Sequence, residues 1–449
     1  MKILLPALSP TMETGNLVKW LVEEGQKVNS GDLIAEIETD KATMELEAPD
    51  DGTINQLVVS EGTENIKVNS LIAILDVEGE DLENDVIPSD EIVTKEQPKK
   101  DVDSSISMNS IINSSEENNS NWTEVEITMR EALNQAIEEE MNRDKDVFLL
   151  GEEVAEYNGA YKASKGMLDE FGDIRVIDTP ISELGFAGIG VGSTMTGNRP
   201  IIEFMTFNFA LVGIDQIINN AAKIRQMSGG QFPCPIVFRG PTASAGQLAA
   251  THSQAFESWY ANCPGLKVIV PSNPYDAKGL LKSAIRDEDP VIFMESEQMY
   301  GDKGEVPEGE YTLPIGVADI KREGKDVTIV SFGKIIKVAY EAAETLSKQG
   351  VECEIIDLRT IRPMDYEAIF NSVKKTNRLV ILEESWPFGN ISTEITYQVQ
   401  NQIFDFLDAP IEKINTADTP APYSPVLLAE WLPNSDDVIK AVKKVMYMT

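Results

Sequence analysis

The chain has 449 residues and carries 75 acidic against 38 basic side chains, a formal net charge of −37. This acidic balance repels nucleic acid phosphates and anionic lipid, so it disfavours nucleic acid and membrane partners. The length suits about three domains at roughly 150 residues each. Three scattered cysteines exclude a disulfide framework or a zinc site, and we interpret them as buried thiols in a reducing compartment: Cys234, Cys263 and Cys353.

The first 78 residues contain an internal sequence repeat. "VNSGDLIAEI" from Val28 and "VNSLIAIL" from Val68 each follow a turn that contains glycine. Two copies of one strand pattern predict a small all-β sandwich with pseudo-symmetric halves.

Lys41 is a single cation among carboxylates and apolar residues. The flanking segments "IAEIETD" and "ATMELEAP" alternate polar and apolar residues, which predicts a hairpin with Asp40 and Lys41 in the turn. On spacing alone, a solvated turn lysine is the ordinary interpretation.

A wider pattern changes that interpretation. "GDLIAEIETDKATMELEAPDDGTI" and "LPALSPTMETGNLVKWLVEEGQKV" closely resemble lipoyl domains across residues 1–78. Biotin carriers, which are the nearest relatives, place the lysine between methionines, where this chain has Asp40 and Ala42. The resemblance implies that Lys41 carries lipoic acid in amide linkage, attached by a lipoate-attaching enzyme.

Residues 79–122 are rich in Asp, Glu, Ser and Asn, and their apolar residues follow no sustained period. Such a composition cannot bury enough apolar surface to offset the entropy of ordering. We therefore predict a flexible acidic linker.

The rest of the chain predicts two α/β domains, residues 123–300 and 322–449, joined by a turn-rich connecting segment at 301–321. Thr128 and Glu131 have capping-box spacing, before a helical face with apolar residues at Leu133, Ala136, Ile137 and Met141. Apolar strands such as "RPIIEF", "CPIVF", "LKVIV" and "PVIFME" then alternate with helical stretches, which is typical of a parallel sheet covered on both faces. The alternation restarts at "DVTIVS".

The segment "DTPISELGFAGIGVGSTMTG" contains Gly188, Gly190 and Gly192. The third glycine is displaced from a dinucleotide-binding fingerprint, so we predict a close-packing helix instead. Glu183 lies at a strand-to-helix junction among Ile181, Leu184 and Phe186, an apolar setting that suits proton transfer. A glutamate at a helix start can also be a simple cap.

Residues 122–449 closely resemble the β subunits of the decarboxylating component of pyruvate dehydrogenase complexes. The match includes "LLGEEVAEYNGAYK", "EFMTFNFALVGIDQIINNAAK", "PIVFRGPTASAGQLAATHSQAFESWYANCPGLKVIVPS" and "LRTIRPMD". It implies a pyrimidine-binding domain for thiamine diphosphate followed by a transketolase C-terminal-like domain. Glu183 would then hydrogen-bond the aminopyrimidine ring, and Glu152 would be a second acid near it. Phe209 and Met205, which the pattern alone would place in a core, match the apolar wall against that ring.

His252 is the only histidine in the chain. A lone histidine is usually structural, but the resemblance implies an active-site role toward substrate or an incoming lipoyl group, and imidazole suits proton transfer near neutral pH. The family also has a structural potassium site. It would fall on Ile236, Ala284, Ile285, Asp287 and Asp289, and Asp289 stands where relatives often have Asn.

No "GDG" motif occurs in the chain, although thiamine diphosphate enzymes anchor the diphosphate through magnesium at such a motif. The resemblance implies that an α subunit holds this half of the cofactor in an α2β2 heterotetramer. It also implies a dihydrolipoamide acetyltransferase core as partner, with dihydrolipoamide dehydrogenase reached through the lipoyl arm. The expected compartment is the bacterial cytoplasm, or the mitochondrial matrix if a transit peptide has been removed.

Two rival functions stay open. The first is a branched-chain 2-oxoacid or acetoin dehydrogenase β subunit. The segments "EFMTFNFA" and "TIRPMD" favour the pyruvate enzyme over this rival. The second is a non-catalytic carrier and scaffold, against which the presence of both Glu183 and His252 argues.

Overall fold

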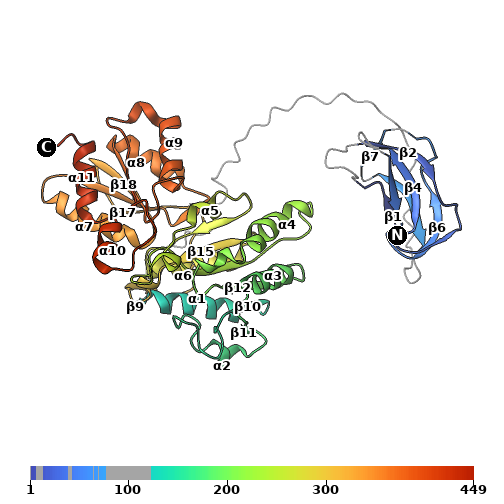
Figure 1. The fold of residues 1–449 in the computed structure, drawn as a ribbon, viewed down its shortest axis with the longest axis horizontal. Coiled ribbons are helices and arrows are strands. Elements are labelled where there is room, and N and C mark those ends of the chain that lie inside the picture. Colours follow the sequence, from blue (N-terminus) through green and yellow to red (C-terminus); the bar gives the residue numbers. More distant parts are fainter. Residues whose placement is uncertain are drawn as a thin grey trace. The chain divides into compact units, whose positions relative to one another are not determined.

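The computed structural model describes residues 2–6, 14–38, 43–63, 65–68, 70–76 and 123–448 (Figure 1). The chain divides into two compact units, residues 1–112 and 113–449. The expected linker at 79–122 lies outside the described residues. Within the described ranges, no helix combines the length and the apolar character that a bilayer crossing requires.

The first unit contains two four-stranded sheets. One has the order β1 (Lys2–Leu4), β8 (Leu71–Asp76), β6 (Gly52–Leu57) and β3 (Lys27–Val28). The other has the order β5 (Thr43–Glu47), β4 (Leu33–Glu38), β2 (Thr14–Trp20) and β7 (Ile66–Lys67). Strands β4 and β8 carry the two copies of the repeat. Each is the second strand in the order of its sheet, which confirms the predicted pseudo-symmetry. Their small and branched residues fill the core from both sides: Ile34, Ala35, Ile37, Ile72, Ala73 and Leu75.

The predicted hairpin around Lys41 is present. Strand β4 pairs antiparallel with β5, and Glu38 lies opposite Thr43 at the end next to the connection. Lys41 itself lies outside the described residues. The strand pairing is therefore confirmed, whereas the role of Lys41 stays a prediction.

The first α/β domain is built on a seven-stranded sheet with the order β11-β10-β12-β13-β15-β14-β20. Six strands run parallel, as predicted: β10 (Val147–Gly151), β11 (Val176–Asp178), β12 (Arg199–Glu203), β13 (Val237–Pro241), β14 (Lys267–Ile269) and β15 (Val291–Glu295). The main helices are α1 (Met129–Arg143), α2 (Met167–Phe171), α3 (Glu183–Thr194), α4 (Ala222–Met227), α5 (Glu257–Ala261) and α6 (Pro274–Arg286). Short helical turns are η3 (Phe209–Leu211), η4 (Gln216–Ala221), η5 (Ala250–His252) and η6 (Glu297–Met299).

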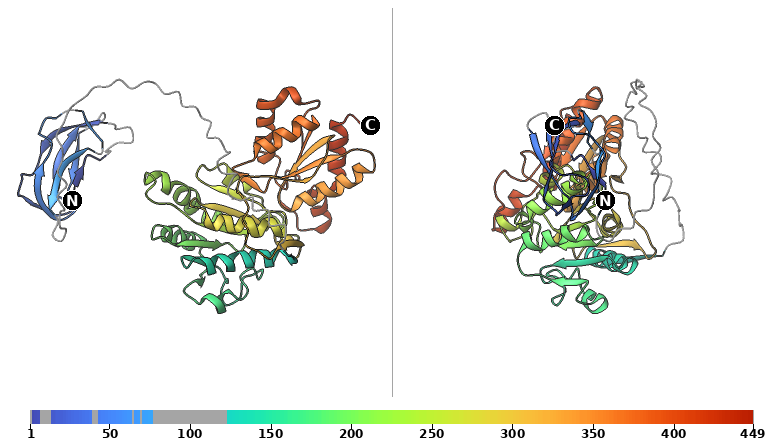
Figure 2. Two further views of the ribbon diagram at one scale, coloured as in Figure 1. Left: turned by 180° about the vertical axis from the view of Figure 1, so that it is seen from behind. Right: turned by 90° about the vertical axis from the view of Figure 1, so that its right-hand side faces the viewer.

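Helices cover both faces of this sheet. Val237 and Phe293 contribute to a core with α1 and α6, whereas Phe238 and Ile292 contribute to a core with α3 and η4. Because successive strand residues point to opposite faces, strands that are apolar throughout require a cover on each side. Helices α1 and α6 lie side by side on one of these faces (Figure 2).

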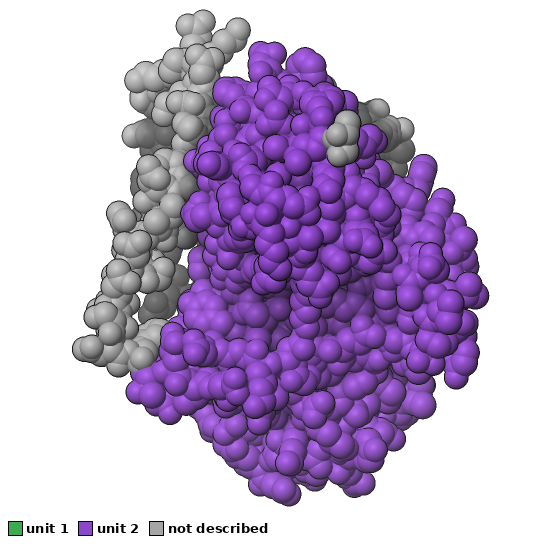
Figure 3. Space-filling model, turned by 90° about the vertical axis from the view of Figure 1, so that its left-hand side faces the viewer, with its two compact units in different colours: residues 1–112 green, residues 113–449 purple. Residues whose placement is uncertain are grey.

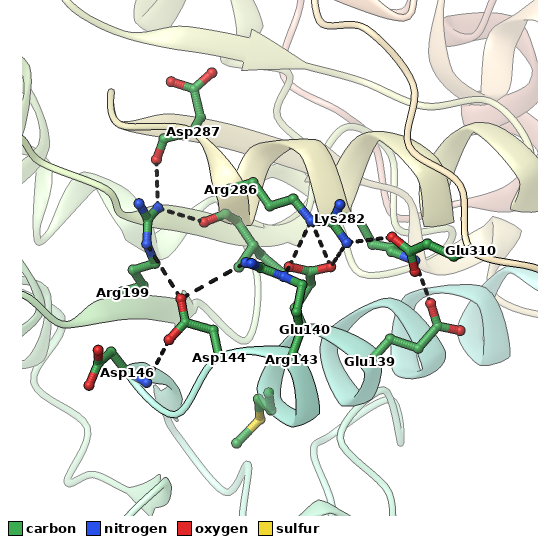
Figure 4. Close-up of polar contacts among 12 residues, drawn as sticks. Glu139, Glu140, Arg143, Asp144, Asp146, Arg199, Lys282, Arg286, Asp287 and Glu310 are labelled. Atoms are coloured by element: carbon green, nitrogen blue, oxygen red, sulfur yellow. Dashed lines mark hydrogen bonds and ion pairs between the residues drawn. The ribbon is translucent and has the colours of Figure 1, made fainter. Parts of the chain in front are cut away.

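Helix α1 begins as the sequence predicts. Thr128 Oγ1 accepts a hydrogen bond from the Glu131 N–H at 3.2 Å, and Glu131 accepts one from the Thr128 N–H at 2.8 Å. The packing against α6 adds an ionic contact that periodicity does not reveal. Glu140 is fully buried and accepts hydrogen bonds from Arg286 Nε at 3.0 Å and from Arg143 Nε at 2.7 Å (Figure 4).

The glycine-rich segment forms helix α3, and the close-packing interpretation is confirmed at Gly188 and Gly190. At Gly192 an added Cβ atom would meet no described atom within 4 Å, so the interpretation is wrong there. A Cβ atom added at Gly190 would lie 2.5 Å from Cδ1 of Ile202 on strand β12. One added at Gly188 would lie 3.3 Å from the Gln216 side chain. A helix can approach the sheet this closely only where side chains are absent.

The second α/β domain has a five-stranded sheet with the order β17-β19-β18-β21-β22. Its strands are β17 (Asp319–Arg322), β18 (Val327–Ser331), β19 (Cys353–Asp357), β21 (Leu379–Leu382) and β22 (Glu412–Ile414). Its helices are α7 (Ile336–Ser347), α8 (Tyr366–Thr376), α9 (Ile391–Ile403), α10 (Pro425–Trp431) and α11 (Ser435–Val445), with short turns η7 (Gly333–Ile335) and η8 (Phe404–Phe406).

Two strands depart from the predicted organisation. The turn-rich connecting segment contains β16 (Lys303–Pro307), which pairs antiparallel with β9 (Glu124–Thr128). Strand β20 (Thr360–Arg362) leaves the second domain and pairs antiparallel with β14 of the first. Both strands depend on partners far away in the sequence, so their short local patterns do not reveal them.

The two α/β domains therefore form one body, which a space-filling view shows as a continuous surface (Figure 3). One hydrophobic core joins Val268 and Val270 of the first domain to Phe332 and Leu358 of the second. Cys234, Cys263 and Cys353 are buried and free, as predicted.

Candidate active site

The predicted active-site residues gather beyond the carboxyl ends of four neighbouring parallel strands. Glu152 follows β10, Glu183 begins α3 after β11, Met205 and Phe209 follow β12, and His252 lies in the segment after β13. The chain runs from β10 to β11 on one side and then to β12 on the other. Such a reversal opens a crevice at the carboxyl edge of a parallel sheet, which is where open α/β sheets bind ligands.

Glu183 is buried at this edge of the sheet. Glu183 lies in the first turn of α3 and is 8% exposed. The segment after η3 packs directly on it, because a Cβ atom at Gly213 would lie 2.9 Å from the Glu183 carbonyl oxygen. This close approach brings the Phe209 segment to the start of α3.

The apolar enclosure predicted around Glu183 is only partly supplied by this chain. Phe186 is buried, but Ile181 is 81% exposed and Leu184 is 48% exposed. The buried positions of α3 recur three and four residues apart, and Leu184 falls outside that stripe. The prediction that Ile181 and Leu184 enclose the carboxyl group is therefore wrong for the chain by itself.

Glu152 provides a second buried carboxyl group in the same crevice. Burial raises the pKa of Glu152, and the negative charge of Glu183 raises it further. Its Oε1 atom is buried and has no hydrogen-bond partner among the described residues. A buried polar atom without a partner is a group that a ligand can satisfy. The pair therefore fits a ring that presents hydrogen-bonding nitrogens, such as an aminopyrimidine.

Phe209 and His252 are brought together from separate segments. Their rings meet edge to face, with centroids 5.0 Å apart and an interplanar angle of 84°. Phe209 is partly exposed and Met205 is half-buried, so neither is a fully buried core residue. Nδ1 of His252 lies 3.1 Å from Oγ1 of Thr251. The imidazole is thus accessible beside an aromatic wall.

Sequence reasoning missed Asn208, which ties the Phe209 segment to the His252 segment. Asn208 is 4% exposed, and its Oδ1 accepts hydrogen bonds from the Gln254 N–H at 3.0 Å and from Gln254 Nε2 at 3.3 Å. The available signal was one amide residue between two phenylalanines in "TFNFA". A buried amide requires partners, which marks such a position as a connector.

Sequence reasoning also missed a buried ion cluster beneath the crevice. Arg239 Nε donates to Glu295 Oε1 at 2.7 Å, and the same guanidinium forms short contacts with Glu203 and with the second Glu295 oxygen. Tyr300 donates its hydroxyl to Glu295 at 2.7 Å. The signal was a charged residue at the end of each apolar strand, in "RPIIEF", "PIVFRG" and "PVIFME".

The residues named for a potassium site lie together at the end of α6 and near β15. Arg199 Nη1 donates to the carbonyl oxygens of Ile285 and Asp287, each at 3.1 Å (Figure 4). The Asp287 carboxylate accepts hydrogen bonds from Lys267 Nζ at 2.7 and 2.6 Å, and Asp289 lies 3.3 Å from the same ammonium group.

The remaining two carbonyl oxygens in this set already have backbone partners. The Ala284 oxygen accepts from the Asp287 N–H at 3.3 Å, and the Ile236 oxygen accepts from the Val291 N–H at 2.9 Å. Carbonyl and carboxylate oxygens suit a hard cation, so the donor set fits potassium in kind. Because Arg199 already contacts two of these oxygens, potassium binding stays a prediction.

Three family models match the chain. Residues 1–75 match the model described as biotin-requiring enzyme, residues 125–303 match the transketolase pyrimidine-binding domain, and residues 316–438 match the transketolase C-terminal domain. A solved structure described as a split-gene transketolase, an inactive beta4 tetramer, superimposes with a TM-score of 0.60. The superposition includes 72% of the present chain and 99% of the transketolase chain. The two sequences are 21% identical, so the likeness concerns the fold alone.

Two curated relatives are more similar in sequence. The pyruvate dehydrogenase E1 component subunit beta of Rhizobium meliloti is 53% identical and covers 99% of both chains, including the N-terminal domain. The mitochondrial subunit of the same name from Rattus norvegicus is 53% identical over 72% of this chain and 91% of its own length. The chain therefore belongs to the family of pyruvate dehydrogenase E1 component beta subunits, with a domain of the biotin- and lipoyl-carrier type at its N-terminus.

Proposed function

We propose that this chain is the β subunit of a pyruvate dehydrogenase that transfers acetyl groups to lipoyl groups. In that reaction the bond between the carboxylate and the oxo carbon of pyruvate breaks, and carbon dioxide leaves. The electron pair of the broken bond stays on the oxo carbon, which bonds to one sulfur as the lipoyl disulfide breaks. The other sulfur takes up a proton from the solvent and becomes a thiol. The observation that carries the proposal is the buried Glu152–Glu183 pair beside the Phe209–His252 ring contact.

The crevice suits the pyrimidine half of thiamine diphosphate. Glu183 and Glu152 would hold the aminopyrimidine ring, and Phe209 with Met205 would form the apolar wall against it. When bound, the cofactor supplies the nucleophilic carbon and accepts the electrons of the broken bond. Glu183 supplies a carboxyl group at the ring nitrogen, where it orients the ring and moves the proton that activates the cofactor.

His252 would act on the substrate side of the same crevice. His252 is only partly buried and its ring lies against Phe209, which leaves part of the side chain open to a reactant. An imidazole exchanges protons readily near neutral pH. We propose that it meets the oxo group of pyruvate or the sulfur of an incoming lipoyl group.

A partner subunit would complete the site. The magnesium-bound diphosphate half of the cofactor would be held by an α subunit in an α2β2 assembly. Large apolar side chains are exposed around the start of α3 and after η3: Ile181, Leu184, Ile189 and Val212. A cluster of exposed apolar residues next to a ligand crevice supports a subunit interface at this edge. It would also supply the enclosure that Glu183 lacks in the single chain.

The N-terminal domain would act as an acetyl carrier. Lipoate in amide linkage on Lys41 would remove the charge of the lysine and hold the disulfide on a long arm. The arm would deliver the acetyl group to a dihydrolipoamide acetyltransferase core, and dihydrolipoamide dehydrogenase would reoxidise the thiols. We further propose that Lys41 accepts acetyl groups from the active site to which it is tethered by residues 79–122.

The potassium site and the compartment are also proposed. Potassium would be bound by the carbonyl oxygens of Ile236, Ala284 and Ile285 with Asp287 and Asp289, at the end of α6. The acidic charge and the free buried thiols suit the cytoplasm of a bacterium, or the mitochondrial matrix if a transit peptide has been removed.

The reconstituted pair of α and β subunits tests the function. Turnover of pyruvate should exceed turnover of 3-methyl-2-oxobutanoate and of acetoin, whereas the reverse order would assign the chain to a branched-chain or acetoin enzyme. Replacement of Glu183 by Gln should reduce turnover about 10²-fold or more in an assembled, cofactor-supplied pair. Full activity of that variant would instead favour a carrier and scaffold without a catalytic role.

A further inference from the structure

The segment that carries His252 runs from the end of β13 to the start of α5, residues 242–256, and we refer to it as the His252 loop. Two of its non-glycine residues adopt left-handed backbone conformations, Ala243 at φ 61° and Ala249 at φ 65°. Such conformations are unfavourable for residues with a Cβ atom and persist only where surrounding contacts hold them. Contacts with the rest of the protein, rather than local backbone propensity, therefore fix the conformation of the loop.

Contacts within the first domain hold the far end of the loop. Asn208 accepts hydrogen bonds from Gln254, and the Ala243 N–H donates to the Gln254 carbonyl oxygen at 3.0 Å. The Ala245 N–H donates to Ser253 Oγ at 3.4 Å, next to His252 in the chain. These bonds tie the start of the loop to the residues that flank His252.

The second domain holds the loop at Ser244. The Ser244 N–H donates to Oε1 of Glu384 at 2.7 Å, and the Ser244 carbonyl oxygen accepts from Nζ of Lys334 at 2.6 Å. Lys334 Nζ lies 3.1 Å from the same Glu384 oxygen. One residue of the loop is thus bound at both backbone polar groups by one ion pair from the other domain.

This ion pair is nearly dry. The side chains of Lys334 and Glu384 are 11% and 5% exposed. They border a small cavity of about 20 Å³, together with Thr242, Glu257 and Ser296. The second Glu384 oxygen and Ser296 Oγ have no hydrogen-bond partner among the described residues, and a cavity of this size holds one water molecule.

A dry ion pair contributes little net stability but can specify one geometry strongly. We propose that Lys334 and Glu384 are positioning residues, which set the place of His252 in the crevice through the backbone of Ser244. The relation to catalysis rests on the proposed function, but the geometric effect on His252 does not.

Lys337 offers a matched control. It lies three residues after Lys334 and pairs with Asp302, so it also joins the second domain to the chain before it. Among the described residues, no hydrogen bond or ion pair joins Lys337 to the His252 loop. Lys334→Met removes an ion pair within the second domain together with its hydrogen bond to Ser244, whereas Lys337→Met removes an ion pair to the connecting segment and leaves Ser244 bound.

Because His252 is the only histidine, its imidazole can be observed directly in the assembled protein. The β subunit is labelled with ¹³C-histidine, produced without a histidine tag and assembled with an unlabelled α subunit. We expect one imidazole resonance in the parent protein and in Lys337→Met, and a shifted or broadened resonance in Lys334→Met. The double variant Lys334→Met/Glu384→Gln, which leaves no buried carboxylate unpaired, should show the same change if Lys334→Met assembles poorly.

Kinetics then separates positioning from function. If the parent pair turns over pyruvate, we expect kcat to fall at least 10-fold in Lys334→Met with a smaller change in KM for pyruvate, and Lys334→Arg to restore part of the loss. An unchanged His252 resonance in both the single and the double variant would overturn the positioning proposal. A parent pair that is inactive toward pyruvate, but shows the resonance change, would overturn only the proposed function.

Discussion

The rings of Phe209 and His252 meet edge to face at 5.0 Å, although 43 residues separate them. Strand β12 leads to the first and strand β13 to the second, and Asn208 binds the two segments together. A parallel sheet places the ends of adjacent strands at one edge, so two distant residues share a crevice.

Glu183→Gln should reduce kcat of the reconstituted pair about 10²-fold or more, because the amide cannot exchange the proton that a carboxyl group does. The matched control is Glu156→Gln, an exposed acid on the nearby loop, which should retain activity. Steady-state turnover with pyruvate, at saturating cofactor, measures both variants. Equal activity of the two variants would contradict the role of Glu183.

Phe209→Leu should weaken binding of thiamine diphosphate roughly 2- to 10-fold. An aromatic contact with the pyrimidine ring is worth about 0.5–1.5 kcal/mol, and a leucine side chain covers less of a flat ring. Calorimetric titration of the assembled pair with cofactor measures the change. Phe232→Leu is the control, because Phe232 is an exposed phenylalanine that belongs to none of the predicted site residues. A similar loss in both variants would refute the wall assigned to Phe209.

Arg239→Met should destabilise the chain by about 3–5 kcal/mol, because Glu203 and Glu295 would be left buried without their cation. Arg225→Met removes a guanidinium that is half exposed, and its pair with Asp289 should contribute about 1 kcal/mol or less. Thermal unfolding of the purified variants compares the two losses. Similar melting temperatures would show that the buried cluster is dispensable.

Glu257→Gln should change how stability depends on pH. Burial raises the pKa of Glu257 from the ordinary carboxyl range to about 8, so the folded chain holds this proton at pH values where the unfolded chain loses it. Stability from this group is therefore fully present below about pH 4.5 and is lost as the pH rises to about 8, by at most about 1.4 kcal/mol per pH unit.

A glutamine at position 257 stays neutral at every pH in this range. Its side-chain oxygen can still accept the hydrogen bond from Thr242 Oγ1. The melting temperature of Glu257→Gln should therefore rise relative to the parent protein between pH 5 and pH 8. A difference that stays constant across this range would contradict the raised pKa.

Lys41→Arg should abolish the mass increment of lipoate and the pyruvate-dependent acetylation of this chain. Arginine keeps the positive charge but cannot form the amide. Lys67→Arg, on the short strand β7 of the same domain, should retain both properties. Intact mass spectrometry, before and after incubation of the reconstituted pair with pyruvate, measures both. Lipoate on Lys41 without any acetylation would refute the tethered-carrier proposal.

The sequence by itself determined the features that depend on local pattern. The capping box at Thr128, the hairpin on both sides of Lys41 and the glycine-rich helix after Glu183 are each specified within a few residues. Periodicity and capping act over one or two turns of chain, so the order of the strands and helices can be read along the sequence. Family resemblance then singled out His252 and Phe209.

Only the tertiary structure decided which distant groups meet. Strand β20 joins the other domain's sheet, Arg239 pairs with Glu203 and Glu295, and the Lys334–Glu384 pair binds Ser244. Leu184 is apolar in sequence yet exposed, because the face of α3 that packs on the sheet excludes it, and Ile181 is exposed just before that helix. Such contacts depend on how the sheets stack residues that lie tens to more than a hundred positions apart, and no local pattern carries that information.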